Sequence, residues 1–173
     1  FSLSLSYSPE FLGSDLTYIR LFGQYSHYQP LFSNLTWASN LQVGIGNAFD
    51  QLMIPSKRFY AGGGNSIRGF QRDQVGPYNP FLERPEGGEG LFITNQELRF
   101  PLYKWFSGVV FFDAGNVYRY LEDFKPWELR TGAGMGLRVN TPVGLLRLDY
   151  GINLSPEERE PRAVWFFSIG QAF

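Results

Sequence analysis

Hydrophobic and polar residues alternate along most of this chain, in eight stretches that are separated by turn-rich segments. The last stretch, Ala163–Phe173, alternates clearly, and the one before it separates apolar from polar residues more sharply, with Leu146, Leu148 and Tyr150 on one face and Arg147 and Asp149 on the other. This alternation is typical of a β-strand, in which successive side chains point to opposite faces. No long stretch has the periodicity of a helix. We therefore predict an all-β protein.

The predicted strands cover Ser2–Ser8, Leu16–Ser26, Trp37–Gly46, Leu91–Phe100, Gly108–Val117, Leu129–Val139, Leu146–Leu154 and Ala163–Phe173. A tilted strand of roughly 10 residues is long enough to cross a bilayer. A soluble sandwich or a lipocalin-like barrel also alternates. A transmembrane antiparallel β-barrel is favoured because one face is wide and aromatic while the other carries many charges, namely Glu97, Arg99, Arg130, Arg138, Arg147 and Asp149.

The connections between the predicted strands alternate in length, and the longest by far is 47–90. Membrane barrels of this kind have long extracellular loops and short periplasmic turns. If the strand that ends at Phe173 ends at the periplasm, counting strands backwards places the 47–90 loop outside the cell. The prediction is one membrane domain, residues 1–173, with a long extracellular loop at about 47–90.

Composition narrows the possible partners and chemistry. A formal net charge of −1 gives no reason to expect nucleic acid as a partner, and the lack of cysteine removes disulfides and thiolate metal sites. No run of about 18 apolar residues is present, which argues against a transmembrane helix. The chain begins with Phe1 rather than Met, so we expect a processed or excised chain.

The residue types that enzymes use do not gather in a recognisable pattern. No Gly-Lys-Ser/Thr follows the glycines at 62–64, so they do not form a phosphate-binding loop. His27 is the single histidine, which leaves a catalytic triad or a histidine metal cluster unsupported. Carboxylates opposite several arginines are typical of a structural charge network. We expect a protein that is not an enzyme and has no cofactor.

The segment Arg58–Phe70 reads Arg-Phe-Tyr-Ala-Gly-Gly-Gly-Asn-Ser-Ile-Arg-Gly-Phe. It resembles the signature loop of the outer-membrane assembly-factor superfamily, the BamA- and TamA-like barrels. Further segments resemble the strands that follow this loop in the family, in the same order: Asn95–Leu102, Gly108–Gly115, Gly132–Gly151 and Ile169–Phe173. The last of these is similar to a terminal assembly signal with an aromatic final residue, here with Gly170 and Phe173.

The resemblance implies that the 47–90 loop folds back into the lumen and forms a site there. In the family, the loop arginine pairs with an acidic residue on the inner wall. In this chain the loop arginine would be Arg68, which lies between Ile67 and the pair Gly69-Phe70. Its acidic partner would be Asp113. Glu97 on the neighbouring strand would share the lumen with them. The resemblance also implies an outer-membrane location in a Gram-negative bacterium or an organelle, and insertion or translocation of unfolded client proteins. Such a barrel opens laterally at its seam and templates client strands, with periplasmic accessory proteins as further partners.

The chain departs from the family in one respect: it supplies eight strands where the family has sixteen. It is therefore half of a longer chain, a protomer that completes a barrel by forming a homodimer, or a narrow barrel of its own. The last is disfavoured because a loop of about forty residues would not fit inside eight strands. A passive channel, a dedicated secretion pore and a membrane anchor for another domain remain alternative functions.

Overall fold

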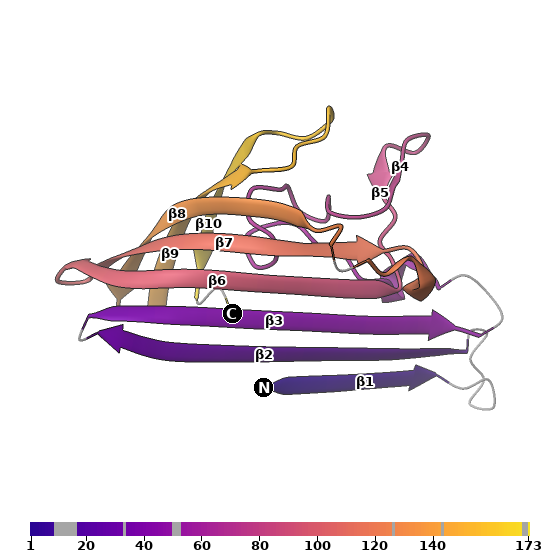
Figure 1. Ribbon diagram of the computed structural model, residues 1–173, viewed down its shortest axis with the longest axis horizontal. Coiled ribbons are helices and arrows are strands. Elements are labelled where there is room, and N and C mark those ends of the chain that lie inside the picture. Colours follow the sequence, from indigo (N-terminus) through magenta and orange to yellow (C-terminus); the bar gives the residue numbers. More distant parts are fainter. Residues whose placement is uncertain (9–16, 33, 50–52, 126, 143, 171–172) are drawn as a thin grey trace.

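The structure is a computed structural model that describes residues 1–8, 17–32, 34–49, 53–125, 127–142, 144–170 and 173 (Figure 1). Eight antiparallel strands form one sheet in the order β1-β2-β3-β6-β7-β8-β9-β10. Their bounds are Ser2–Ser8 (β1), Tyr18–Phe32 (β2), Leu35–Ala48 (β3), Gly90–Tyr103 (β6), Phe106–Tyr118 (β7), Arg130–Thr141 (β8), Gly144–Asn153 (β9) and Ala163–Ile169 (β10). The predicted all-β class and the eight strands are confirmed.

Most strand boundaries differ from the prediction by up to about three residues, and two differ by more. Strand β2 runs on to Phe32 instead of ending at Ser26, and Pro30 lies at the irregularity in its pairing with β3. Proline is tolerated there because a bulge and an edge position need no ladder hydrogen bond from its nitrogen. The predicted first residue of this strand, Leu16, lies outside the described residues. Strand β10 ends at Ile169 rather than at Phe173.

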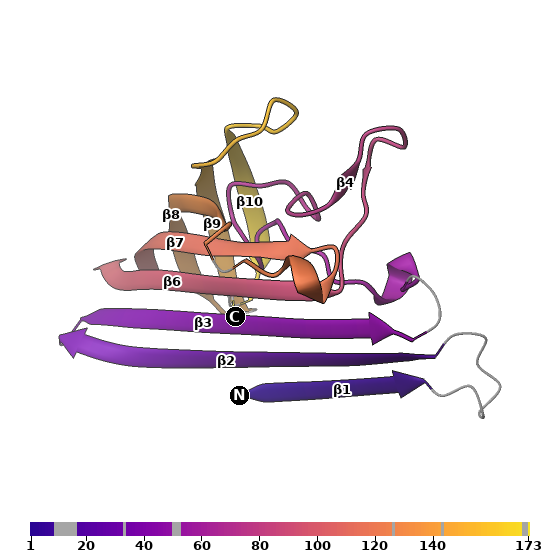
Figure 2. The same ribbon diagram turned by 45° about the vertical axis from the view of Figure 1, so that its right-hand side comes forward.

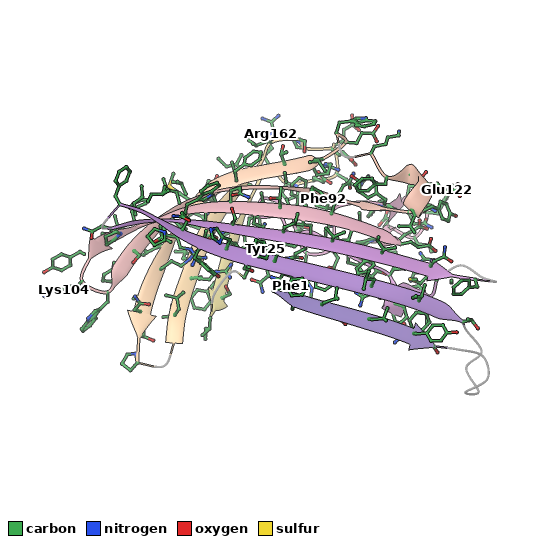
Figure 3. The ribbon with its side chains drawn as sticks, turned by 60° about the horizontal axis from the view of Figure 1, so that its bottom comes forward. Phe1, Tyr25, Phe92, Lys104, Glu122 and Arg162 are labelled. Atoms are coloured by element: carbon green, nitrogen blue, oxygen red, sulfur yellow. The ribbon has the colours of Figure 1, made fainter. Side chains whose placement is uncertain are left out.

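The sheet has one apolar face and one mixed face, as the alternation predicts. On β10, Trp165, Phe167 and Ile169 are 65–69% exposed on the convex side. On the neighbouring β9, Arg147 and Asp149 point to the concave side and are buried. Figure 3 shows Lys104 at one end of the sheet and Glu122 at the other, with Tyr25 and Phe92 on the strands between them. The convex face is thus apolar and exposed, as predicted for a surface that contacts lipid.

The sheet is strongly curved and open. Strands β8, β9 and β10 rise out of the plane of β1–β3 and curl back over the concave side (Figure 2). In the described part of the chain, β1 pairs with β2 alone and β10 with β9 alone, so the sheet does not close on itself. This is the geometry expected for part of a larger barrel.

The loop between β3 and β6 packs against the concave face. It contains a 3-10 turn at Pro55–Lys57 and a small hairpin of β4 (Tyr78–Asn79) and β5 (Arg84–Pro85). The main hydrophobic cluster joins the loop to the wall, through Phe59, Ala61, Ile67, Phe70 and Val75 of the loop and Leu91, Ile93 and Val117 of the strands. The loop therefore supplies most of this cluster.

No helix in the described parts of the chain is long and apolar enough to cross a membrane. A second 3-10 turn, at Leu121–Asp123, follows β7.

Candidate functional site: a buried loop arginine on the inner wall

The loop reaches the inner wall through a tight, glycine-dependent turn. Gly69, directly after Arg68, has a φ of +100°, a conformation that side chains other than glycine rarely adopt. A Cβ atom at Gly69 would also lie 2.7 Å from the main-chain oxygen of Ile152 on β9. Gly69 is therefore required twice, by its own backbone and by the close approach of the wall.

Arg68 is 1% exposed and makes a two-point contact with Asp113 of β7. Its Nε and Nη2 atoms donate to the two carboxylate oxygens at 2.7 and 2.8 Å, and its main-chain N–H donates to Oδ2 at 3.0 Å. Nη1 donates to Glu97 of β6 at 2.5 Å. The guanidinium also lies 3.6 Å from the ring centroid of Phe111. The contact that the resemblance implies between Arg68, Asp113 and Glu97 is thus present.

Strand register explains why these acids meet one arginine. In the β6–β7 ladder, Glu97 is directly opposite Phe111. Asp113 is two residues beyond Phe111, so it is the next residue of β7 that faces inward. Glu97 and Asp113 are therefore diagonal neighbours on the inner face. Antiparallel neighbours of this kind bring side chains on one face within reach of a long guanidinium. The two carboxylates therefore converge without any special local backbone.

Glycines on β8 and β9 make room for the loop backbone. A Cβ atom at Gly132 would overlap the main-chain oxygen of Arg68, and one at Gly151 would overlap the main-chain nitrogen of Gly69. Gly132 is the direct partner of Asp113 in the β7–β8 ladder, and Gly151 lies on the next strand, opposite Gly134. The loop therefore rests on these glycines of β8 and β9.

A wider charge network surrounds this pair. Glu97 also accepts from Nε of Arg99 at 2.7 Å, and Asp149 pairs with Arg138 and, at 3.2 Å, with Arg147. Arg147 in turn donates to the Gly64 carbonyl at 2.7 Å and to the Asn65 side chain at 3.1 Å, so it binds the loop a second time. Among the described residues the network has four arginines, including Arg68, and three carboxylates, which leaves an excess of one positive charge.

The charge on Arg68 is secure. Burial alone would lower the pKa of Arg68, but its hydrogen bond to Asp113 and the charges of Asp113, Glu97 and Asp149 outweigh burial and raise the pKa above its usual value. The guanidinium therefore remains protonated, and the site is a permanent ion-pair cluster. Breaking such a buried pair by removing one partner costs about 3–5 kcal/mol, because the other charge stays buried.

Arg130, predicted as a lumenal charge, belongs to a different cluster. Its guanidinium lies 5.0 Å from the Phe70 ring centroid and pairs with Glu157 at 2.6 Å and Glu160 at 2.5 Å. Asn153 also donates to Glu160, at 3.0 Å. The β9–β10 connection, which carries Glu157 and Glu160, thus holds Arg130 against Phe70, outside the main charge network. Sequence reasoning missed Glu160 because nothing distinguishes it among the acidic residues of that connection.

A ladder of amides was also missed. Asn95 donates to the Ser66 carbonyl of the loop at 2.6 Å and accepts from Asn40 of β3 at 2.9 Å. Gln24 and Ser26 of β2 donate to the side chain of Asn40, at 3.0 and 3.1 Å. These side chains hold one another across β2, β3 and β6, and Asn95 joins them to the docked loop.

Gly170 and Phe173, predicted as a terminal signal that continues the last strand, lie elsewhere. Gly170 has a φ of +108°, and β10 stops directly before it. Phe173 lies on the concave side, where its oxygen accepts from the Tyr28 hydroxyl at 2.6 Å. The prediction of a strand to Phe173 failed because alternation cannot reveal a left-handed residue. Gln171, placed on the same predicted face, lies outside the described residues.

The site has no feature of a metal centre: in the parts of the chain that the structure describes, no cluster of three or more histidine, cysteine, aspartate or glutamate side chains is arranged to hold an ion. Its carboxylates are already occupied by arginines.

Known proteins resemble the chain over most of its length. The chain is 30% identical over 174 aligned residues to "Outer membrane protein assembly factor BamA" of Nitratidesulfovibrio vulgaris, covering 94% of this chain and 21% of that protein. It is 32% identical to the chloroplastic outer envelope protein 39 of Arabidopsis thaliana, covering 58% of this chain and 27% of the relative. The chain thus spans about a fifth to a quarter of these relatives.

The fold has a solved counterpart. The crystal structure of BamA from Haemophilus ducreyi lacking POTRA domains 1–3 matches 90% of this chain with a TM-score of 0.74 at 23% identity, and the match covers 35% of that structure. This likeness shows the fold of a membrane β-barrel segment.

The bacterial and chloroplast relatives agree on the outer membrane as the location. The model of the Omp85 superfamily domain matches residues 1–173. With its curved antiparallel sheet, its lumen-docked loop and these relatives, the chain is an outer-membrane β-barrel segment that belongs to the Omp85 superfamily.

Proposed function

We propose that this chain is part of a non-enzymatic barrel that inserts unfolded client proteins into the outer membrane by strand templating at an opened seam. The observation that carries the proposal is the edge of β10, which in the described residues has a partner on one side, β9, over seven residue pairs. An edge strand offers main-chain N–H and C=O groups to any incoming strand, independent of its side chains. A client of any sequence can therefore pair with it.

The docked loop suits this role because it fixes the shape of the wall beside that edge. Arg68 joins the loop to β6 and β7, and Arg147 joins it to β9, the strand that pairs with β10. Four neighbouring strands, β6 to β9, thus keep their curvature while the edge opens. The assembly role named for the BamA relative supports the same conclusion.

The test is Arg68→Ala in the full-length protein, with Arg72→Ala as the matched control. Arg72 lies on the same loop, but its side chain is 90% exposed and pairs with Asp73 at 3.5 Å. We expect Arg68→Ala to lower the amount of folded client barrels in the outer membrane and to make the loop sensitive to protease, because the buried Asp113 loses its partner and Glu97 loses one of its partners. Arg72→Ala should change neither. Normal client levels together with normal loop protection in Arg68→Ala would refute the role of Arg68.

A pore for anionic solutes is the second candidate, and the excess of arginine on the inner wall favours it. Single-channel recordings separate the two functions. A large, steady, anion-selective conductance would indicate a pore, whereas small and irregular openings would fit a lumen filled by its loop. Periplasmic accessory proteins and a second copy of the chain stay predictions as partners.

A further inference from the structure

The amide ladder, formed by Gln24, Ser26, Asn40 and Asn95, follows one row of the sheet. Ser26 of β2 is directly opposite Asn40 of β3, and Asn40 is directly opposite Asn95 of β6. Asn95 is in turn opposite Asp113 of β7, the partner of the loop arginine. Side chains that face each other on neighbouring antiparallel strands lie within contact of one another. The row therefore joins β2 to the site where the loop docks, across strands that lie side by side (Figure 1).

The docked loop fixes the direction of this ladder at one end. The Ser66 carbonyl only accepts hydrogen bonds, so Asn95 turns its amide nitrogen toward it, at 2.6 Å. The side-chain oxygen of Asn95 then faces Asn40, which supplies its own amide nitrogen at 2.9 Å. Asn40 and Asn95 are 1% and 3% exposed, so water does not replace these partners.

The same direction continues to β2. With its nitrogen on Asn95, Asn40 offers its oxygen to β2, where it accepts from the Gln24 amide at 3.0 Å and from the Ser26 hydroxyl at 3.1 Å. Every donor in the ladder thus points toward the loop. A main-chain carbonyl of the loop sets the orientation of a side chain on β2, which is two strands away from β6.

The ladder is satisfied equally well in the reverse direction when the loop is away. A primary amide has donors on its nitrogen and an acceptor on its oxygen, and a hydroxyl both donates and accepts. If the amides turn over, Asn95 donates to Asn40, and Asn40 donates to Gln24 and to Ser26. The ladder keeps its three internal hydrogen bonds, but the Asn95 oxygen now faces the Ser66 carbonyl and repels it. Only one of the two arrangements therefore accepts the docked loop.

We propose that the amide ladder is a two-state relay that couples docking of the loop to the lumenal face of β2, with Asn40 as a positioning residue that acts on the loop through Asn95. A docked loop holds the ladder in the direction of Ser66. A change on β2 that reverses the amide of Gln24 disfavours docking in turn, because two sites that bias the same two-state element are coupled in both directions.

The first experiment measures the loop and involves no client. The full-length protein and its variants are placed in lipid nanodiscs, and hydrogen exchange of segment 59–70 is followed by mass spectrometry. Asn40→Asp keeps the shape of the side chain but removes its donor, so Asn95 turns its nitrogen to the new carboxylate and its oxygen to Ser66. We expect loop exchange to rise by about five- to 100-fold, the value of a buried acceptor left without a donor.

Asn40→Leu separates the direction of the ladder from packing. Leucine removes both donor and acceptor, but it leaves Asn95 free to keep its nitrogen on Ser66. We expect a rise of about two- to tenfold, the value of one hydrogen bond, which is smaller than the effect of Asn40→Asp. An effect of leucine that equals or exceeds that of aspartate would show that Asn40 supports the wall by packing, and would overturn the relay.

Gln42→Glu is the matched control for the added charge. Gln42 is on the same strand and the same concave face, directly opposite Gln24, and its side chain is not part of the ladder. It should leave loop exchange unchanged, and a rise as large as that of Asn40→Asp would overturn the relay. If Asn40→Asp does not fold, the half-buried Gln24 repeats the comparison. Gln24→Glu should open the loop more than Gln24→Leu, because leucine leaves Ser26 to hold the direction, and the opposite order would overturn the relay.

A double variant gives a readout that a purely structural role of Asn40 would not change. In Asn95→Leu the ladder has no route to the loop, so the addition of Asn40→Asp should have no further effect on loop exchange. Independent sites would instead add their effects. Additive effects would overturn the role of Asn40 as a positioning residue.

The effect on clients rests on the proposed function and has its own readout. In the same variants, the rate of client insertion is compared with loop exchange. We expect insertion to fall most in Asn40→Asp, less in Asn40→Leu and not at all in Gln42→Glu. An opened loop with unchanged insertion would overturn the effect on clients while the relay to the loop stands. Absent insertion in the wild-type protein would instead count against the proposed function.

Discussion

Along its strand order the sheet has two sides, β1 on one and β6–β9 on the other, which are built from the same alternation but are stabilised differently. On β1 the concave face carries Ser2, Ser4, Ser6 and Ser8, and much of this strand is exposed on both faces. From β6 to β9 the concave face carries buried charges, among them Glu97, Asp113 and Asp149. The difference is the loop, which covers β6–β9 and brings Arg68 with it. An inner wall becomes charged and rigid where another segment rests on it.

The largest contrast between the two sides is expected from removing one polar group on each. Asp113→Ala should lower the free energy of unfolding by about 3–5 kcal/mol, because Arg68 would stay buried with half of its partners lost. Ser4→Ala on β1 should change it by less than about 0.5 kcal/mol, since that side chain is exposed. Denaturant titration followed by tryptophan fluorescence measures both. Equal effects would mean that the loop does not distinguish the two sides.

A smaller difference in stability is expected between variants of two arginines, one on β8 and one on β2, each of which lies against an aromatic ring of the loop. Arg130→Gln should cost about 1.5–3 kcal/mol, because Glu160, whose side chain is 1% exposed, loses its ionic hydrogen bond. Arg20 of β2 lies 4.1 Å from the centroid of Phe59, and Arg20→Gln should cost only the cation–π contact, about 0.5–1 kcal/mol. The same titration compares them. An Arg20→Gln variant that is the less stable of the two would place the loop's main support on β2.

Glycine substitution sharpens the comparison further. Gly132→Ala should cost about 1–3 kcal/mol and expose the loop to protease, because the new methyl group would displace the carbonyl of Arg68. Gly23→Ala on β2 is the control, since its Cβ would meet a side-chain atom of Leu3 at an ordinary 3.7 Å. Limited proteolysis with mass spectrometry locates any new cleavage. Protection of the loop in Gly132→Ala would show that it does not rest on β8.

The pair at the centre of the site was accessible from the sequence, and its surroundings were not. Arg68 lies in a recognisable loop, and the alternation of β7 places Asp113 on the inner face. Glu160 and Tyr28 carried no such signal, because an acidic residue in a connection and a tyrosine near a proline are common in any barrel. The last strand was predicted to reach Phe173, since period-two alternation was extended through Gly170, whose positive φ ends the strand.

The sequence by itself determined the strands, their two faces and the charge of the inner wall, because these depend on neighbours two residues apart in a single strand. It also determined where the loop begins and ends, since 47–90 lacks strand alternation. Only the tertiary structure decided what the inner charges bind. Strand register brought Glu97 and Asp113 to one arginine, and the glycines of β8 and β9 let the loop approach. Such contacts join residues tens of positions apart, and no local pattern in the chain records them.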